Sequence, residues 1–364
     1  MLTVAVDATP LAGDRTGIGR AVSGLVRKLA ARDDLTLVGY GLTAGGWHRV
    51  REALPEGSKP ARGPMPAAAL LRVWARADMP PVELWTGDID VVHGTNYVVP
   101  PARNAARLVS VWDLTAVRYP ELCTATSRRY PQLVERAIGQ GAWVHTGACS
   151  VAREIVDHFG VEPSRVRVIP PGLDPPAAVS TGGQGGPPYI LGLGRTEPRK
   201  DFPGLVSAFD RIASSHPDLQ LWIAGPAGWG EDDLDAAIRS SPNRAKIKRL
   251  GWVSDASTLV SRAEVFAYPS IYEGFGYPPL EAMSFGVPVV ATSAGALPEV
   301  AGDAVVMVEP GDTDALAGAL ARVLGDEGLR QQLVEKGKNR VARFTWDAAA
   351  SATRALYEEI AGSR

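Results

Sequence analysis

Short apolar runs alternate with longer amphipathic segments along most of the chain. The first run is LTVAVD (2–7), and a second series of runs begins with YILGLG (189–194). Apolar runs of this length, bounded by polar or turn-forming residues, predict buried strands. We expect these strands near residues 2–7, 35–40, 89–93, 107–112, 143–146, 165–169, 189–194, 219–225, 246–251, 264–269, 287–292 and 304–309.

Helical patterns lie between many of these strands. We expect them near residues 20–32, 127–140, 150–159, 203–214, 254–262, 278–285, 313–324 and 346–361. Strands separated by helices predict parallel βαβ units with helices on both faces of each sheet. The fold class is therefore predicted to be α/β, with two Rossmann-like doubly wound domains. Open sheets of this kind bind ligands at the carboxyl ends of their strands, so we expect the two domains to face a cleft there.

One breaker-rich segment divides the chain. The sequence STGGQGGPP (180–188) combines Gly, Pro and Ser in a way that suits a flexible linker. We expect a first domain over residues 1–178, a linker over 179–188, a second domain over 189–345 and a closing helix within 346–364.

Composition narrows the class of protein. The 364 residues are 45% hydrophobic and 21% charged, which allows two full-sized cores. The formal net charge of −2 gives no overall basic field, and we expect no nucleic-acid partner. The two cysteines, Cys123 and Cys149, form no CxxC pair and no zinc pattern.

The start of the chain and the length of its apolar runs predict the cellular compartment. The start of the chain, MLTVAVDATP, lacks the pattern of a signal peptide, and no uncharged apolar run reaches the roughly 18 residues of a membrane span. We therefore predict a cytoplasmic protein, with the inner face of the membrane as an alternative place. The apolar, lightly basic segment 65–80 suits either packing against the first domain or contact with a membrane surface or lipid acceptor.

The strongest functional motif is PSIYEGFGYPPLEAMSFGVPVVAT (269–292). A strand is expected to end near Pro269, a Gly-rich turn follows, and two prolines open a helix near Pro278. The free N–H groups at the start of that helix suit a diphosphate, and glycines let a phosphate approach the backbone. Glu273 and Glu281 would repel a phosphate, so we expect them to bind neutral sugar hydroxyls. The structural alternative is an ordinary strand-to-helix turn with a capping glutamate.

A second motif, GLGRTEPRKDF (192–202), follows the first strand of the second half. Arg195 and Lys200 lie in a predicted strand-to-helix loop, where two cations can stabilise a diphosphate leaving group. Arg199 is expected to be the solvated member of the three. The structural alternative is a solvated basic loop.

A third motif, LAGDRTGIGR (11–20), follows the first strand. Gly13, Gly17 and Gly19 permit a tight loop, and Arg15 and Arg20 add positive charge. The spacing does not fit the dinucleotide pattern G-x-G-x-x-G. The segment suits a phosphate or an acceptor, or it is a structural glycine loop.

Together these segments resemble a known family. GRTEPRKDF, the stretch from YEGFGYPPLEAM to VVAT, IPPGLD (169–174) and DATPLAGDRTGIGR (7–20) look like the family-4 retaining glycosyltransferases of GT-B fold. More narrowly, they are similar to the mannosyltransferase-like branch of bacterial cell-envelope enzymes. The resemblance covers residues 3–345, nearly the whole chain.

The resemblance implies a division of labour between the domains. The first domain would serve the acceptor, the second would bind the nucleotide sugar, and the closing helix would cross back onto the first. Arg195 and Lys200 would bind the donor diphosphate, Glu273 would contact the donor sugar, and Glu281 would hold the ribose. The remaining donor-binding positions would be Phe275, Gly276 and Tyr277, Val253 at the base, and Gly17 and Gly19 from the first domain.

One position departs from the family pattern. The family often has His-Asp where this chain has Trp112-Asp113. An indole N–H donates one hydrogen bond and cannot relay a proton, which excludes that role here. Trp112 could bond a sugar hydroxyl, stack on a sugar face, or mark weak activity. Asp113 and His93 are further candidates on the acceptor side, with a satisfied structural histidine as the alternative reading of His93.

These expectations combine into one function. The resemblance implies retaining transfer of a hexose from a nucleoside-diphosphate sugar to a saccharide or lipid-linked acceptor, without a cofactor or a required metal. GDP-mannose is the favoured donor, with UDP- and dTDP-linked sugars next. Two alternatives keep the fold: an inactive sugar-nucleotide-binding protein, suggested by Trp112, and a nucleotide-sugar epimerase.

Overall fold

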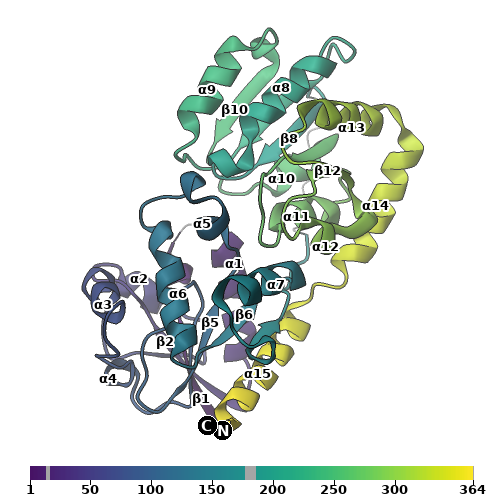
Figure 1. The fold of residues 1–364 in the computed structure, drawn as a ribbon. Helices are drawn as coiled ribbons and strands as arrows, with labels where there is room; N and C mark the ends of the chain where they lie inside the picture. The colour runs from purple at the N-terminus through teal and green to yellow at the C-terminus, as the bar shows by residue number, and fades with distance from the viewer. Residues whose placement is uncertain (14–16, 177–185, 364) are drawn as a thin grey trace. The chain divides into compact units, whose positions relative to one another are not determined.

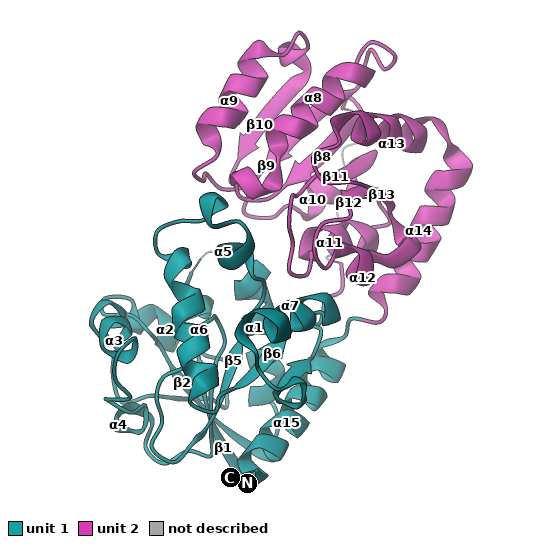
Figure 2. Ribbon diagram, viewed as in Figure 1, with its two compact units in different colours: residues 1–174, 344–364 teal, residues 175–343 magenta. Residues whose placement is uncertain are grey.

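The computed structural model describes residues 1–13, 17–176 and 186–363. The chain forms two compact units, shown in different colours in Figure 2. Unit 1 contains Met1–Asp174 and Phe344–Arg364, and unit 2 contains Pro175–Arg343. Arg15 lies outside the described residues, as does most of the predicted linker.

Unit 1 is built on a parallel sheet whose described strands follow the order β3-β2-β1-β4-β5-β6-β7. These strands are β1 (Leu2–Asp7), β2 (Leu35–Tyr40), β3 (Lys59–Pro60), β4 (Val91–Gly94), β5 (Ala106–Ser110), β6 (Trp143–Thr146) and β7 (Val166–Val168). Its helices are η1 (Thr9–Ala12), α1 (Gly17–Ala30), α2 (Trp47–Ala53), α3 (Ala67–Trp74), α4 (Glu83–Thr86), α5 (Thr115–Arg118), η2 (Pro120–Leu122), η3 (Ser127–Arg129), α6 (Tyr130–Gly139), α7 (Cys149–Phe159), η4 (Pro163–Arg165) and α15 (Trp346–Gly362).

The C-terminal helix α15 belongs to unit 1, although it follows unit 2 in the sequence (Figure 1). Thr345 begins the helix, because its hydroxyl accepts a hydrogen bond from the N–H of Ala348. The helix packs against α1, where Gly24 leaves room for the ring of Trp346: a Cβ at position 24 would lie 2.2 Å from that ring. Burial of its apolar face against the sheet therefore fixes α15 to this unit.

Unit 2 has a second parallel sheet, whose described strands follow the order β10-β9-β8-β11-β12-β13. These strands are β8 (Tyr189–Leu193), β9 (Gln220–Ala224), β10 (Ile247–Gly251), β11 (Val265–Tyr268), β12 (Val289–Thr292) and β13 (Val306–Val308). Its helices are η5 (Pro198–Lys200), α8 (Phe202–Ile212), α9 (Glu231–Ser240), η6 (Arg244–Lys246), α10 (Ser257–Ser261), α11 (Tyr277–Ser284), α12 (Leu297–Ala301), η7 (Gly302–Ala304), α13 (Thr313–Gly325) and α14 (Glu327–Val341).

The core of unit 2 follows the alternation of side chains along its strands. Val265 and Ala267 of β11 belong to the cluster that also holds α8 and α13, while Phe266 and Tyr268 point to the opposite face. Asp201 and Asp312 cap α8 and α13, each accepting a backbone N–H of the first turn. Two parallel sheets with covering helices confirm the predicted class of two Rossmann-like domains.

Two features bear on the predicted environment. Among the described helices, none has both the length and the apolar character needed to cross a bilayer. Within the segment 65–80, helix α3 buries Leu70 and Trp74 in unit 1 and leaves Val73 43% exposed. This segment therefore packs against unit 1, as one of its two predicted roles requires. Its contact with a membrane stays a prediction.

Candidate functional site

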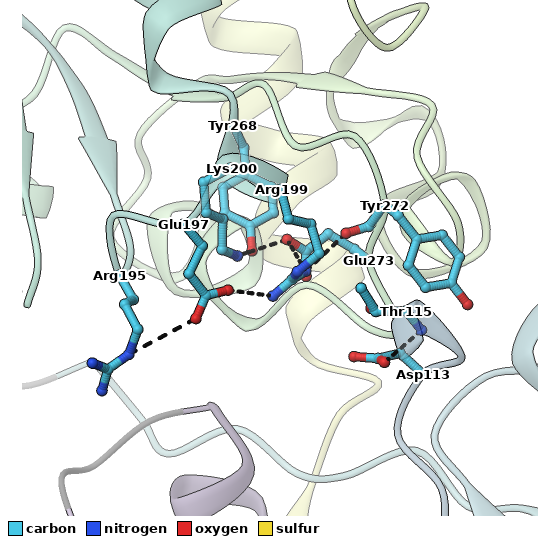
Figure 3. Close-up of polar contacts among 9 residues, drawn as sticks. All are labelled: Asp113, Thr115, Arg195, Glu197, Arg199, Lys200, Tyr268, Tyr272 and Glu273. Atoms are coloured by element: carbon cyan, nitrogen blue, oxygen red, sulfur yellow. Dashed lines mark hydrogen bonds and ion pairs between the residues drawn. The ribbon is translucent and has the colours of Figure 1, made fainter. Parts of the chain in front are cut away.

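The two strongest motifs meet at the middle of the sheet of unit 2. From β8 the chain first builds β9 and β10 on one side, and then returns to place β11 directly beside β8 on the other. This reversal of strand order is the place where open α/β sheets bind ligands. The loop 194–201 follows β8 and the loop 269–276 follows β11, so both predicted motifs lie at that switch point (Figure 3).

Glycines let the loop 269–276 make its turn. Gly276 has a φ of 102° at the N-cap of α11, a conformation that other residues rarely adopt. Gly295, from the loop after β12, has a φ of 56° and passes so close that a Cβ there would lie 2.2 Å from the carbonyl oxygen of Glu273. The neighbouring N–H of Ala296 donates to the same carbonyl at 2.8 Å. These contacts hold the backbone of Glu273 in place.

A buried ion cluster joins the two loops. The Nζ of Lys200 lies 2.6 Å from the Oε1 of Glu273 and 2.6 Å from the hydroxyl of Tyr268. The Nη1 of Arg199 lies 2.9 Å from the same Oε1, and it also donates to the carbonyl of Tyr272 at 2.8 Å. The side chains of Glu273, Lys200 and Arg199 are only 8%, 10% and 15% exposed.

Charge and burial oppose each other in this cluster. Burial by itself raises the pKa of Glu273, but the charges of Arg199 and Lys200 and the hydrogen bond from Lys200 lower it to about 2. Burial lowers the pKa of Lys200. The charge of Glu273 opposes this lowering, and the charge of Arg199 adds to it. Glu273 is therefore a carboxylate at neutral pH and does not act as a proton donor there.

Arg195 lies at the more open side of this cluster. Its guanidinium donates to the carbonyl of Ala227 at 3.0 Å and lies 3.8 Å from Glu197, and its side chain is 32% exposed. Glu197 in turn pairs with Arg199 at 3.4 Å. The expectation that Arg199 is the solvated cation is wrong: Arg199 is the buried one, because Glu197 and Glu273 both compensate its charge, and Arg195 is the exposed one.

The other predicted donor-binding residues of unit 2 lie on neighbouring segments. Phe275 and Tyr277 are buried with ring centroids 5.3 Å apart, on either side of Gly276 at the start of α11. Glu281 lies in α11 and is partly exposed, and Val253 is partly exposed just after β10. Their donor-binding roles stay predictions. Among the described residues, no cluster of His, Cys, Asp and Glu side chains could hold a metal ion.

In unit 1, the predicted glycines begin a helix. Gly17 and Gly19 lie in the first turn of α1, with Gly17 exposed and Gly19 buried. Arg15 precedes them outside the described residues. A role of this turn in donor or acceptor binding stays a prediction.

Two of the residues predicted for the acceptor side of unit 1 are bonded within the unit instead. The indole N–H of Trp112 donates to the carbonyl of Thr95 at 2.9 Å and the ring is buried, so this N–H is not available for a sugar hydroxyl. Both ring nitrogens of His93 are bonded inside the unit, to Tyr357 at 2.7 Å and to Ser110 at 2.8 Å, as its structural reading requires. His93 is therefore removed from the acceptor side.

Asp113 has a local structural function. Its Oδ1 accepts the N–H of Thr115 at 2.9 Å at the start of α5 (Figure 3). This is the short-range bond by which an aspartate stabilises a turn. A role in orienting an acceptor stays a prediction.

Comparison with known proteins adds independent evidence. Residues 16–172 match the model of the glycosyl transferase 4-like domain, and residues 178–340 match that of glycosyl transferases group 1. The chain is 30% identical over 296 residues to the MMP alpha-(1->4)-mannosyltransferase of Mycolicibacterium hassiacum, with 75% of this chain and 71% of that protein covered. This chain belongs to the family-4 GT-B glycosyltransferases.

A second curated relative of this glycosyltransferase matches over a shorter segment, whereas a solved structure matches over nearly the whole chain. It is 36% identical over 173 residues to the O-antigen chain mannosyltransferase B of Escherichia coli, a match that spans 47% of this chain and about half, 45%, of that protein. The crystal structure of HepE from Anabaena in complex with UDP and glucose has a TM-score of 0.76 at 18% identity, covering 99% and 100% of the two chains. The predicted family and its mannosyltransferase-like branch are confirmed, and the structural likeness supports the GT-B fold.

Three participants in the ion cluster of this glycosyltransferase were missed in the sequence. Tyr268 is the last residue of β11, Glu197 bridges two arginines, and Arg199 adjoins Lys200. The sequence signal for Tyr268 was its position near the end of the predicted strand 264–269, while the adjacency of β8 and β11 comes from the structure. No local pattern distinguishes Arg199 from Arg195, because both are arginines in one polar loop.

Proposed function

We propose that this glycosyltransferase transfers a hexose, with mannose favoured, from a nucleoside-diphosphate sugar to a saccharide or lipid-linked acceptor with retention of the anomeric configuration. The M. hassiacum and E. coli relatives are both named as mannosyltransferases. GDP-mannose is therefore the first donor to test.

The observation that carries the proposal is a cluster of three cations at the switch point of unit 2. Arg195, Arg199 and Lys200 are three cations, against the two carboxylates Glu197 and Glu273. A balanced ion pair suffices for packing. Arg195 is partly exposed, and α11 begins directly after the loop that holds Glu273. A cationic side chain and the partial positive charge of the N–H groups in the first turn of a helix both suit a diphosphate.

Lys200 has a donor for a phosphate oxygen beyond the two bonds that it makes in the cluster. An ammonium has three N–H donors, and two from Lys200 are used by Tyr268 and Glu273. Arg195 presents a partly exposed guanidinium in a planar fork that matches phosphate geometry. Groups that bind the departing diphosphate more strongly as its charge develops lower the barrier of the transfer step.

The proposed step needs no side-chain base. The bond between the anomeric carbon and the diphosphate oxygen breaks, and the acceptor hydroxyl forms the new bond from the same face. The acceptor proton passes to a phosphate oxygen of the leaving group. Glu273 stays ionised because its pKa is held at about 2. Its carboxylate can therefore accept a hydrogen bond from a hydroxyl of the transferred sugar.

The test combines transfer, hydrolysis and binding. We expect the protein to release mannose from GDP-mannose slowly in water and to transfer it with retention, seen by NMR of the product anomer. Lys200→Ala should lower turnover by about 100-fold, the scale of losing one transition-state donor. Lys336→Ala is the matched control, because Lys336 is 47% exposed and pairs with Asp303, which is 83% exposed.

Several results would contradict the proposal. Unchanged turnover in Lys200→Ala would remove the diphosphate role of this cluster. Nucleotide binding without any hydrolysis or transfer would favour a binding protein, and conversion of the donor to an epimeric nucleotide sugar would favour an epimerase. A thermal-shift screen supports each assay, since a nucleoside diphosphate at 100 times its Kd stabilises the folded state by about 2.7 kcal/mol.

A further inference from the structure

Arg199 holds the two motif loops of unit 2 together. Its side chain contacts Glu273 at 2.9 Å, the carbonyl of Tyr272 at 2.8 Å and Glu197 at 3.4 Å. Its own carbonyl accepts the N–H of Ile271 at 2.8 Å. The guanidinium therefore lies between a carboxylate from each loop and is bonded to the backbone of one of them (Figure 3).

Lys200 is held differently. Its ammonium bonds to the hydroxyl of Tyr268 and to the Oε1 of Glu273, and it lies 4.5 Å from the centre of the Tyr268 ring. A lysine carries its charge on a flexible four-carbon stem with three rotatable donors, whereas an arginine is a rigid fork that keeps its charge in proteins. Of the two cations on Glu273, Lys200 is the one that can turn toward a ligand.

We propose that Arg199 is a positioning residue of the donor site, which compensates the charge of Glu273 so that Lys200 is free to bind the donor diphosphate. This inference rests on the proposed function. When a phosphate draws the ammonium of Lys200 away, the buried carboxylate of Glu273 keeps Arg199 as its partner. Glu273 and Lys200 can then act on the donor at the same time.

The electrostatics of the pair explain why one cation is not enough. A buried carboxylate without a cation is strongly disfavoured, so a lone Lys200 would be retained by Glu273 rather than shared with a ligand. The charge of Arg199 also repels Lys200 and reinforces the lowering of its pKa that burial causes, which weakens the hold of the site on the ammonium. Arg199 thus contributes to donor binding without contacting the donor.

The discriminating variant is Arg199→Gln. With Lys200 alone on Glu273, we expect GDP, measured by calorimetry, to bind at least about ten-fold more weakly, the scale of losing one charged hydrogen bond. KM for GDP-mannose should rise more than kcat falls. The pKa of Glu273 should rise, because one of the two cations that lower it is gone. Protonation of Glu273 removes the charge that retains Lys200, so the difference in GDP affinity between Arg199→Gln and the wild type should narrow as the pH falls.

A double variant separates this role from a structural one. In Arg199→Gln combined with Glu273→Gln, the carboxylate that retains Lys200 is absent, so GDP affinity should return to within about three-fold of the wild type. GDP contains no sugar to be transferred, so loss of the sugar contact at Glu273 does not obscure this result. If Arg199 only supported the loops, the second substitution would not restore affinity. Arg199→Lys should rescue part of the affinity.

The matched control is Arg211→Gln. Arg211 lies on α8 of the same unit and pairs with Asp314, which is 83% exposed. Its removal should leave GDP binding and the pH profile unchanged. Weak GDP binding by Arg199→Gln with recovery in the double variant supports the inference. Unchanged affinity in Arg199→Gln, or no recovery in the double variant, overturns it while wild-type binding leaves the proposed function intact. Failure of the wild type to bind any nucleoside diphosphate overturns both.

Discussion

A chain of buried hydrogen bonds in unit 1 predicts how this unit responds to acid. Tyr357 of α15 contacts the Nδ1 of His93 at 2.7 Å, and the Nε2 of His93 contacts Ser110 at 2.8 Å. Ser110 contacts the Nδ1 of His145 at 2.8 Å, and the Nε2 of His145 contacts the carbonyl of Ile169 at 3.0 Å. A carbonyl only accepts, so His145 must donate there. Burial lowers the pKa of both histidines, so both are neutral at neutral pH, and each proton along the chain is then fixed.

The magnitude follows from the pKa of His145. Burial lowers it from 6.5 to about 4, against the opposing hydrogen bond to Ile169. Because the folded-state pKa is the lower one, the unfolded chain binds the proton more tightly, and stability is lost as the pH falls from about 6.5 toward 4. At about pH 5 the loss amounts to about 2 kcal/mol. Burial and the nearby His145 also lower the pKa of His93, which adds a loss in the same direction.

Asp7 opposes this effect. Burial, partly offset by hydrogen bonds from Thr9, raises the pKa of Asp7 from 3.8 to about 6. The folded state therefore binds this proton more tightly, and acidification to about pH 5 stabilises unit 1 by about 1 kcal/mol through Asp7. The contribution of Asp7 is present in wild type and in His145→Gln alike. Comparing the two isolates the histidine.

The assay is hydrogen exchange by mass spectrometry at about pH 7.5 and about pH 5, corrected for the intrinsic exchange rate. We expect peptides from β5, β6 and α15 to lose protection at the lower pH, and those from β8 and β9 of unit 2 to serve as internal controls. In His145→Gln, whose amide can occupy the same bonds without titrating, the loss should be smaller by about 2 kcal/mol. An equal loss in the variant and the wild type would refute the assignment of the acid response to this chain.

Three further predictions concern single side chains. Gly295→Ala should weaken GDP binding and lower the melting temperature in a thermal-shift assay. Gly295 has a φ of 56°, and the new Cβ would lie 2.2 Å from the carbonyl oxygen of Glu273. The control Gly318→Ala should do neither, because no atom lies within 4 Å of its new Cβ. Tyr357→Phe should destabilise α15 toward hydrogen exchange by about 1–3 kcal/mol, since it leaves a ring nitrogen of His93 without its partner. Trp112→Phe should cost a similar amount in urea unfolding through the lost bond to the Thr95 carbonyl, and no measurable cost would contradict that bond.

Regular elements were predictable wherever burial sets the pattern. The run LTVAVD became β1 over its whole length, and VPVVAT contains β12, because apolar strands in a parallel sheet are buried on both faces. Helices α9 and α14 were not predicted. In α14 only Leu333 and Gly337 are buried, and α9 buries only Leu234, so neither helix has the wide apolar stripe that identifies a helix in a sequence.

The candidate site was predictable in its location but not in its pairing. Strand-to-helix loops with glycines and cations point to the carboxyl end of a sheet, and the two motifs do lie together there. Which arginine faces Glu273 depends on the turn of η5, where Arg199 and Lys200 are adjacent residues that both reach one oxygen. A contact between side chains 74 positions apart has no local signature in the sequence, as with Arg199 and Glu273.

The charges of Arg199, Lys200 and Glu273 also indicate why these three residues are combined at one site. If stability alone had shaped it, one cation for each buried carboxylate would be sufficient, and an apolar replacement would often do as well. Instead Arg199 and Lys200 share one oxygen of Glu273, and each raises the cost of keeping the other charged. Glu197 also compensates Arg199, so Lys200 is the cation of this pair that a diphosphate can draw away from Glu273, an argument that rests on the contacts and not on the family resemblance.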